Sequence, residues 1–482
     1  MKHIDRLFLC ILLSIVFIGC KNEHKPSKKN KNEDVSKTPL FVDVLENQYD
    51  GIPLNANIFG FNTAYLYQDI LLSNHEVIQK IKALHPSLIR FPGGTVANYY
   101  HPNGEGFGFR DEEMMLKEKM REIKQKQNNF TSDAQEDAIK LCKETQSKVV
   151  YVVNILTGTP EEAIIVIDRF LKNDIQVVGV ELGNELYFKE YRKEFPNVEA
   201  YIKKCMPFAE RIRMKYPSIK IGVLSPKYKE DHLKDENTLF YKDWNNKLSQ
   251  EYFYDAVIAH YYVNSKPCQS SKKNIEQMFD CSYRTFNILD QNLLGKIRQQ
   301  LKNTYKNKEI WLTEFNINKP QEYFGNTMSQ AFLLGEYLFG MMKNSQGEMP
   351  YTIGAVHQLA SEVAPFAMVY LKNNKAEITA SYLLYQMFGG LSSENTLVKE
   401  INNKGGGFSY LLAEDISTKK QILIYMNKSN KEIKINWGTQ NTCLNNYIKG
   451  ENLWATKDNL FSKTSNLSVA PPISFGVITY NK

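Results

Sequence analysis

The sequence lacks the cysteine and histidine spacings with which proteins bind structural metals. It contains 7 cysteines and 8 histidines, no two cysteines are separated by only two residues, and no cysteine lies in a cluster with histidines. A zinc site is therefore not predicted. We expect the protein to work without a metal or any other cofactor.

A stripe of positive charge with interleaved aromatic residues, as in proteins that bind nucleic acids, is also absent. The formal net charge is +7, but residues 1–39, in which lysines outnumber the acids, carry much of it. The rest of the chain is close to charge balance. A nucleic-acid partner is therefore not expected.

The apolar run near the N-terminus is too short to span a bilayer, which takes about 20 residues. This run, residues 7–19, follows Lys2 and Arg6 and ends at Cys20. The layout resembles a bacterial lipoprotein signal, in which the cysteine becomes the lipidated first residue of the mature protein. We expect residues 1–20 to be such a signal peptide; an uncleaved anchor helix is the alternative.

Residues 21–39 are polar and rich in lysine, so they cannot bury a core and are expected to be a disordered tether. Together with the signal, they predict an outer-membrane lipoprotein of the bacterial cell envelope. The only expected membrane contact is the N-terminal lipid, and either face of the outer membrane is compatible with it.

Two of the remaining cysteines, Cys268 and Cys281, flank one polar loop. In an exported protein they could form a disulfide. Two free thiols are an equally good interpretation of the sequence.

Eight short apolar runs alternate with amphipathic stretches between residues 57 and 389. The runs are continuous and rich in Val, Ile and aromatic residues, which is typical of strands covered on both faces. They lie at 57–62, 87–91, 148–154, 177–183, 219–225, 255–262, 309–315 and 352–358. The sequence therefore predicts an α/β fold, a (β/α)8 TIM barrel over residues 57–389. A doubly wound open sheet is the alternative, but the Gly-rich nucleotide turn that usually follows its first strand is missing.

The hydrophobic pattern of the sequence changes after residue 390. Apolar and polar residues alternate there in short runs separated by Asn, Gly, Lys and Ser turns, without a helical period. Residues 390–482 are therefore predicted to form a small C-terminal antiparallel β-sandwich. Residues 40–56 include a similar alternating run, and we expect it to join the sandwich as an additional strand.

Polar side chains end most of the apolar runs, at the positions where a (β/α)8 barrel carries its active site. Because the preceding strands are buried, polar groups at their ends lower the stability of the fold unless they form hydrogen bonds or have a function. These strand-end residues are Arg90, Asn154, Asn184, Glu185, His260, Tyr262, Glu314 and His357. His260 could instead be a core histidine, and His357 could serve packing alone.

Two carboxylates dominate this set. Glu185 ends the fourth run and Glu314 the seventh, so they can face each other across the barrel mouth. Paired carboxylates are the minimal equipment for hydrolysing a glycosidic bond, with one protonated and the other ionised. We expect Arg90 to lie beside Glu314 and hold it charged. Glu181, inside the fourth run, is expected to be structural.

The motifs RFPGGTVANYY, VELGNELYF, AHYY and IWLTEFN resemble those of the retaining glycoside hydrolases of clan A. The nearest likeness is to the arabinofuranosidases of family 51, the xylosidases of family 39 and the glucuronidase/heparanase group of family 79. It covers roughly residues 55–385 and extends to the small sandwich that these families also carry. One departure is Leu186, where many clan members have proline after the Asn-Glu pair.

The resemblance implies a role for each matching residue. Glu185 would be the acid/base and Glu314 the nucleophile, while Asn184 would bond the sugar 2-hydroxyl. Arg90 would hold the nucleophile in place, and His260 or Tyr262 would lie against it.

These observations predict a retaining glycoside hydrolase that acts on an oligo- or polysaccharide of plant, algal or host origin. An α-L-arabinofuranoside is the first expectation for its substrate, and a β-glucuronide or β-xyloside the second. A non-catalytic glycan-binding surface lipoprotein is the alternative from another functional class.

Overall fold

A computed structural model of the chain describes residues 41–44, 50–63, 74–104, 108–110, 133–227, 235–264, 281–282, 285, 292–318, 324–361, 365–389, 391, 395–403, 407–436 and 443–480. The predicted signal peptide, Cys20 and the tether lie outside these residues. Within the described ranges, every helix is too short or too polar to cross a membrane.

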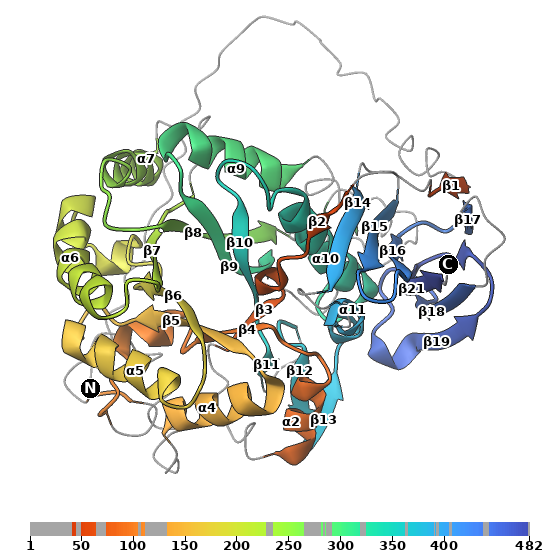
Figure 1. Cartoon of the computed structure of the whole chain (residues 1–482), viewed down its shortest axis with the longest axis horizontal. Helices are drawn as coiled ribbons and strands as arrows, with labels where there is room; N and C mark the ends of the chain where they lie inside the picture. Colours follow the sequence, from red (N-terminus) through yellow and green to blue (C-terminus); the bar gives the residue numbers. More distant parts are fainter. Residues whose placement is uncertain are drawn as a thin grey trace, which may run out of the picture.

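Eight parallel strands close into a barrel in the larger part of the molecule (Figure 1). They are β3 (Gly60–Asn62), β4 (Leu88–Phe91), β5 (Lys148–Val153), β6 (Val177–Leu182), β7 (Lys220–Leu224), β8 (Ala256–Asn264), β9 (Glu309–Asn318) and β10 (Tyr351–His357). They follow one another around the barrel in chain order, and the pairing of β10 with β3 closes it. Each predicted run supplies one strand, so the predicted (β/α)8 barrel is confirmed.

Helices surround the barrel on its outside (Figure 1). They are α2 (His75–Lys82), α4 (Ala134–Thr145), α5 (Pro160–Leu171), α6 (Val198–Lys215), α7 (Glu236–Leu248), α9 (Leu293–Thr304), α10 (Met328–Lys343) and α11 (Ala380–Gly389). The first turn of α5 is stabilised by a capping box, in which Thr159 accepts from the N–H of Glu162 and the Glu162 carboxylate accepts from the N–H of Thr159.

Helix α7 lies between β7 and β8, as a (β/α)8 barrel requires. Its buried residues are Thr238, Trp244, Asn245 and Leu248. Half of this buried set is polar, although Phe240, Trp244 and Leu248 recur at the four-residue spacing of one helix face. The tertiary structure satisfies these polar groups; Asn245, for example, donates to the carbonyl of Pro226 at 2.9 Å.

The C-terminal part forms a sandwich of a seven-stranded and a three-stranded sheet (blue in Figure 1). The larger sheet has the order β19-β18-β21-β16-β15-β14-β2 and the smaller one the order β1-β17-β20. The strands are β1 (Phe41–Asp43), β2 (Ile52–Pro53), β14 (Thr396–Asn402), β15 (Phe408–Asp415), β16 (Gln421–Asn427), β17 (Ile433–Asn436), β18 (Cys443–Gly450), β19 (Leu460–Ser465), β20 (Val469–Ala470) and β21 (Ser474–Tyr480). The predicted sandwich is therefore present. The N-terminal strand β1 departs from the antiparallel pattern, because it pairs with β17 in parallel.

The interior strand β15 of the larger sheet is buried on both faces. Tyr410 and Leu412 point into the core between the two sheets, whereas Leu411 belongs to the core shared with the barrel. This alternation follows from the two-residue period of a strand. Helix α10 lies between the barrel and the sandwich, and it contacts β16 where Gly335 meets Met426. A Cβ atom on Gly335 would lie 2.3 Å from the Met426 sulfur, so a larger residue there would require the Met426 side chain to shift.

The described cysteines are in two chemical states. Cys281 is disulfide-bonded, whereas Cys142, Cys205 and Cys443 are free thiols. Cys268, the predicted partner of Cys281, lies outside the described residues. Burial raises the pKa of the Cys142 thiol to about 12, so this thiol stays protonated and unreactive at neutral pH.

Candidate active site

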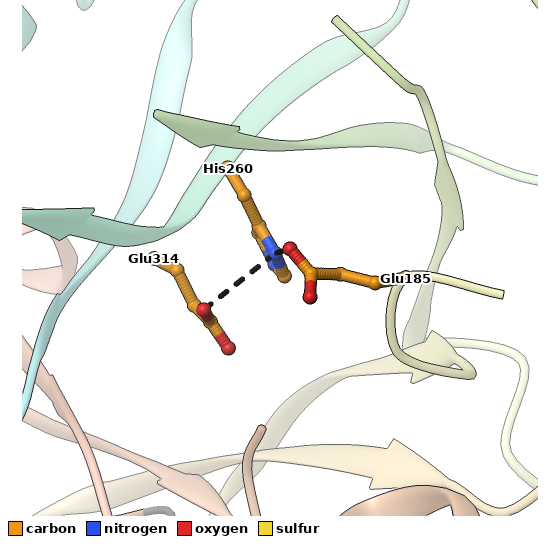
Figure 2. A group of neighbouring side chains, drawn as sticks. All are labelled: Glu185, His260 and Glu314. Carbon is orange, nitrogen blue, oxygen red and sulfur yellow. Dashed lines mark hydrogen bonds and ion pairs between the residues drawn. The ribbon is translucent and has the colours of Figure 1, made fainter. Parts of the chain in front are cut away.

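A sharp turn after β6 carries the Asn-Glu pair. Gly183 has φ of 87°, and a Cβ atom on it would lie 2.5 Å from the Leu186 side chain. Glu185 has φ of 51°, the left-handed region, which costs a non-glycine residue on the order of 1 kcal/mol or more. The turn aims the Glu185 side chain at His260 (Figure 2). Strained backbone of this kind persists where the surrounding structure holds it, often at functional sites.

The structure brings the two predicted carboxylates together around one histidine. Nδ1 of His260 lies 3.0 Å from Oε1 of Glu185 and 3.7 Å from Oε2 of Glu314 (Figure 2). One oxygen of Glu185 and one of Glu314 lie within 4.8 Å of each other. Retaining glycosidases hold their two carboxyl groups about 5–5.5 Å apart, and inverting ones about 6.5–9.5 Å. The two carboxylates therefore lie close enough together to act on one sugar ring.

Both oxygens of Glu314 accept hydrogen bonds from residues of other barrel strands. Oε1 accepts from Nη1 of Arg90 at 2.8 Å and from the amide of Asn62 at 3.1 Å. Oε2 accepts from the hydroxyl of Tyr262 at 2.7 Å. Arg90 and Tyr262 therefore lie against Glu314, where the sequence analysis expects them.

The surroundings of Glu314 favour its ionised form. Burial by itself would raise the pKa of its carboxyl group. The positive charges of His260, Arg90 and His357 and the hydrogen bond from Tyr262 outweigh burial and lower this pKa to about 2. Glu314 is therefore ionised at neutral pH.

His260 is buried, and its contacts are those of a site residue. Burial lowers the pKa of its imidazole, but the carboxylates of Glu314 and Glu185 outweigh this effect and raise it above the ordinary value. Nδ1 of the ring lies 3.0 Å from Oε1 of Glu185, within hydrogen-bonding distance, and Nε2 lies 3.4 Å from the Thr313 hydroxyl. The His260 side chain is therefore largely enclosed, as a core histidine would be, and it also contacts both carboxylates, as a site residue would.

Arg90 links the strand ends through four acceptor atoms. Its side chain is fully buried, donates from Nε and Nη2 to Glu181, and donates from Nη1 to Glu314. Nη2 also donates to Oδ1 of Asn184 at 2.9 Å. Glu181, which the sequence analysis expects to be structural, is fully buried as the second counter-charge of Arg90.

We expect Arg90→Met to lower the free energy of unfolding by about 3–5 kcal/mol, because it leaves the Glu181 carboxylate buried without its counter-charge and removes one of the positive charges beside Glu314. Urea unfolding at pH 7 measures the loss. The control is Lys82→Met, which breaks an ion pair with Glu144 whose side chains are about half exposed; this change should cost less than about 1 kcal/mol. Equal losses in the two variants would contradict the prediction.

Two other predicted site residues have different surroundings. The amide nitrogen of Asn154 donates to the Tyr100 carbonyl at 3.2 Å and to the Thr157 hydroxyl at 2.9 Å. Asn154 thus supports the loops after β4 and β5, and among the described residues it hydrogen-bonds to Tyr100 and Thr157 rather than to either carboxylate. The His357 ring packs edge-on against Tyr262, with the ring centres 6.2 Å apart. His357 therefore packs against Tyr262, and its positive charge contributes to the lowered pKa of Glu314.

Sequence reasoning missed Asn62 and Asn98. Asn62 ends β3, the first barrel strand, so the strand-end rule could have selected it. Asn98 lies in the short 3-10 helix η4 (Thr95–Tyr99) and is fully buried. Its position follows no strand-end pattern, although it lies within the motif RFPGGTVANYY at residues 90–100.

Glu185, His260 and Glu314 are also, among the described residues, a group whose donor atoms could surround a metal ion. Their chemistry fits a metal poorly, because the donors are already engaged. Both Glu314 oxygens accept from Arg90, Asn62 or Tyr262, and Nδ1 of His260 faces Glu185. An ion would have to displace these hydrogen bonds and lie close to the Arg90 guanidinium.

No known family model matches the sequence, and no curated protein matches it significantly. Solved structures do match. The family 51 arabinofuranosidase of Xanthomonas axonopodis pv. citri aligns with a TM-score of 0.65 at 13% identity, over 91% of this chain and 98% of that one. The thermostable family 51 α-L-arabinofuranosidase of Thermotoga petrophila aligns with a TM-score of 0.66 at 16% identity, over 91% and 99%.

A structure from another family shares the same architecture. A family 44 endoglucanase from Clostridium aligns with a TM-score of 0.55 at 12% identity, over 91% of this chain and 99% of that one. Alignment over nearly the whole of both chains includes the barrel and the sandwich together. The chain therefore has the fold of the clan A glycoside hydrolases, the group that its strand-end motifs resemble.

Proposed function

We propose that this protein is a retaining glycoside hydrolase, with Glu185 as its acid/base and Glu314 as its nucleophile. The observation that carries the proposal is the pair itself: an oxygen of each carboxylate lies within 4.8 Å of the other. Glu314 has a pKa lowered to about 2, which suits a nucleophile. Glu185 has 20% of its side chain exposed against 7% for Glu314, which suits a group that meets a departing alcohol and then water.

In the first step of the proposed reaction, Glu314 attacks the anomeric carbon and Glu185 donates a proton to the leaving oxygen. The bond to the leaving group breaks as the glycosyl–Glu314 ester forms. Arg90, Asn62 and Tyr262 hold the attacking carboxylate in one orientation, so little reorganisation accompanies the attack.

In the second step, Glu185 has lost its proton and acts as a base towards water. Water attacks the anomeric carbon, its proton passes to Glu185, and the ester to Glu314 breaks. Two inversions give net retention of configuration. The imidazolium of His260, 3.0 Å from Glu185, stabilises the charge that Glu185 carries between the two steps.

For the substrate we propose an α-L-arabinofuranoside first, supported by the arabinofuranosidases among the similar structures. A β-glucuronide and a β-xyloside, the substrates of the other clan A families that the motifs resemble, are the second candidates. A panel of aryl glycosides, followed by pure oligosaccharides, tests the proposal. Hydrolysis of any member contradicts a purely glycan-binding role, and no hydrolysis of any member contradicts the proposed activity.

The Tyr262→Phe variant should lose about 10- to 100-fold in kcat, because it removes one preorganised hydrogen bond to Glu314. That bond lowers the pKa of Glu314, so its removal raises this pKa. The ionised fraction then falls at a higher pH, and the acidic limb of the kcat/KM profile moves upward. Tyr337→Phe is the control, since the Tyr337 hydroxyl donates to the Tyr261 carbonyl instead. An unmoved acidic limb in Tyr262→Phe would contradict the prediction.

We also propose that the protein is a lipoprotein of the bacterial outer membrane, anchored at Cys20. The support is the short apolar run that follows two basic residues and ends at this cysteine. Labelling of the protein with a fatty-acid analogue should be lost in Cys20→Ala. Labelling that persists in this variant would contradict the anchor.

A further inference from the structure

We propose that Asn98 is a positioning residue for Glu185: it clamps the peptide that precedes Glu185 and thereby holds the acid/base in place. The inference rests on the proposed function. Asn98 comes from a different part of the barrel, because η4 follows β4 whereas Glu185 follows β6. Its side chain is fully buried.

The contact between Asn98 and Asn184 has two points. The Asn184 N–H donates to Oδ1 of Asn98 at 2.8 Å, and Nδ2 of Asn98 donates to the Asn184 carbonyl at 2.7 Å. One side-chain amide therefore satisfies both backbone groups of one residue, as a neighbouring strand would. Nδ2 also donates to the Tyr191 hydroxyl at 3.2 Å, which holds the amide itself in position.

The clamped carbonyl belongs to the peptide bond that joins Asn184 to Glu185. Its orientation fixes the direction of the Glu185 N–Cα bond and so sets where the Glu185 backbone begins. Glu185 has φ of 51°, a conformation that a non-glycine residue leaves unless contacts hold it. Without the two bonds, the peptide can rotate to relieve this strain, and the carboxylate then moves relative to His260.

The turn between β4 and η4 determines where Asn98 lies. Gly93 and Gly94 have φ of 73° and 63°, and they turn the chain from β4 into η4 within two residues. The β4 residue Arg90 holds the Asn184 side chain at 2.9 Å. One segment, residues 90–98, thus holds Asn184 by its side chain and by its backbone.

A positioning role differs from a merely structural one in its kinetics. If Asn98 serves only stability, its loss lowers the amount of active protein and reduces the rates for all substrates by one factor. If it positions the acid/base, the loss falls on substrates whose leaving group needs protonation, because protonation is the task of Glu185. The dependence of kcat/KM on the leaving group separates the two roles.

The test compares Asn98→Ala with the wild type on a series of aryl glycosides of the preferred sugar. We expect kcat/KM to fall by about 10- to 100-fold for phenyl glycosides. For dinitrophenyl glycosides, which leave without a proton, it should fall by less than about 3-fold. Asn98→Asp keeps the oxygen that accepts from the Asn184 N–H, so its loss on phenyl glycosides should lie between those of the wild type and Asn98→Ala.

The matched control is Asn245→Ala. Asn245 is also a buried asparagine with several hydrogen bonds, to Pro226, Ser225 and Tyr305, but it does not contact the Asn-Glu turn. Any loss in this variant should be the same for every leaving group. A uniform loss in both Asn98 variants would overturn the positioning role while leaving the proposed hydrolase intact.

A wild type that hydrolyses no glycoside contradicts the proposed function, and the positioning role is then decided by structure. Crystal structures of Asn98→Ala and Asn98→Asp should show the Glu185 φ and the Glu185–His260 distance changed from 51° and 3.0 Å. An unchanged turn in both variants would overturn the role of Asn98.

Discussion

Glu314→Ala is expected to abolish turnover, with a fall in kcat of at least about 10⁴-fold on every glycoside that the protein hydrolyses. The variant has no carboxylate on β9 to form the glycosyl ester, and the other carboxylates near the site have different tasks. Glu181 is held by Arg90, and Glu185 faces the leaving group. Initial rates on the preferred aryl glycoside, measured on variant protein shown to be folded by circular dichroism, give the result.

Adding azide to Glu314→Ala gives a second test of the role of Glu314 as nucleophile. The removed side chain leaves room for a small anion beside the anomeric carbon, and azide that attacks there in a single displacement gives a glycosyl azide of inverted configuration. Glu309→Ala is the control, since Glu309 begins β9 at the opposite end of the barrel. Wild-type activity in Glu314→Ala, or an azide product of retained configuration, would contradict its role as nucleophile.

Glu185→Ala is expected to lose about 10²- to 10⁴-fold in kcat/KM on phenyl glycosides and far less on dinitrophenyl glycosides. The nucleophile is intact in this variant, so the ester still forms whenever the leaving group departs without a proton. Its breakdown becomes slow, because water is no longer activated. A burst of dinitrophenolate followed by a slow steady state is the expected time course.

Azide should accelerate the slow phase of Glu185→Ala, because it needs no base to attack the ester. The product passes through two displacements and therefore keeps the substrate configuration, in contrast to the product of Glu314→Ala. The control is Glu190→Ala, which removes an exposed carboxylate five residues further along the chain. A loss that does not depend on the leaving group would contradict the acid/base role of Glu185.

The barrel strands could be predicted from the sequence because their burial is uniform. Apart from Glu181, the run at 177–183 is apolar, and five of the six residues of β6 are buried. Helix α7 could not be predicted in this way, because Thr238 and Asn245 occupy positions on its buried face. Asn245 can be buried because it forms hydrogen bonds with segments distant in the sequence. A local sequence pattern does not identify such partners.

The candidate site could be predicted as far as topology alone determines it. Parallel strands of a closed barrel end at one rim, so residues that end separate runs, such as Glu185 and Glu314, converge whatever the details of packing. Asn62 follows the same rule but lacks a charge that would draw attention to it. Asn98 follows no rule of this kind, because its contact with Asn184 joins a 3-10 helix to a turn 86 residues away.

The sequence by itself determined which side chains stand at the strand ends, in what order the strands come, and hence which chemistry the rim can support. The tertiary structure alone decided that oxygens of Glu185 and Glu314 lie within 4.8 Å of each other and that Glu314 has a pKa near 2. Both quantities depend on desolvation and on Coulomb interactions between β4, β8 and β9, which fall steeply with distance. A spacing along the chain carries no information about such distances, so only the folded barrel could supply them.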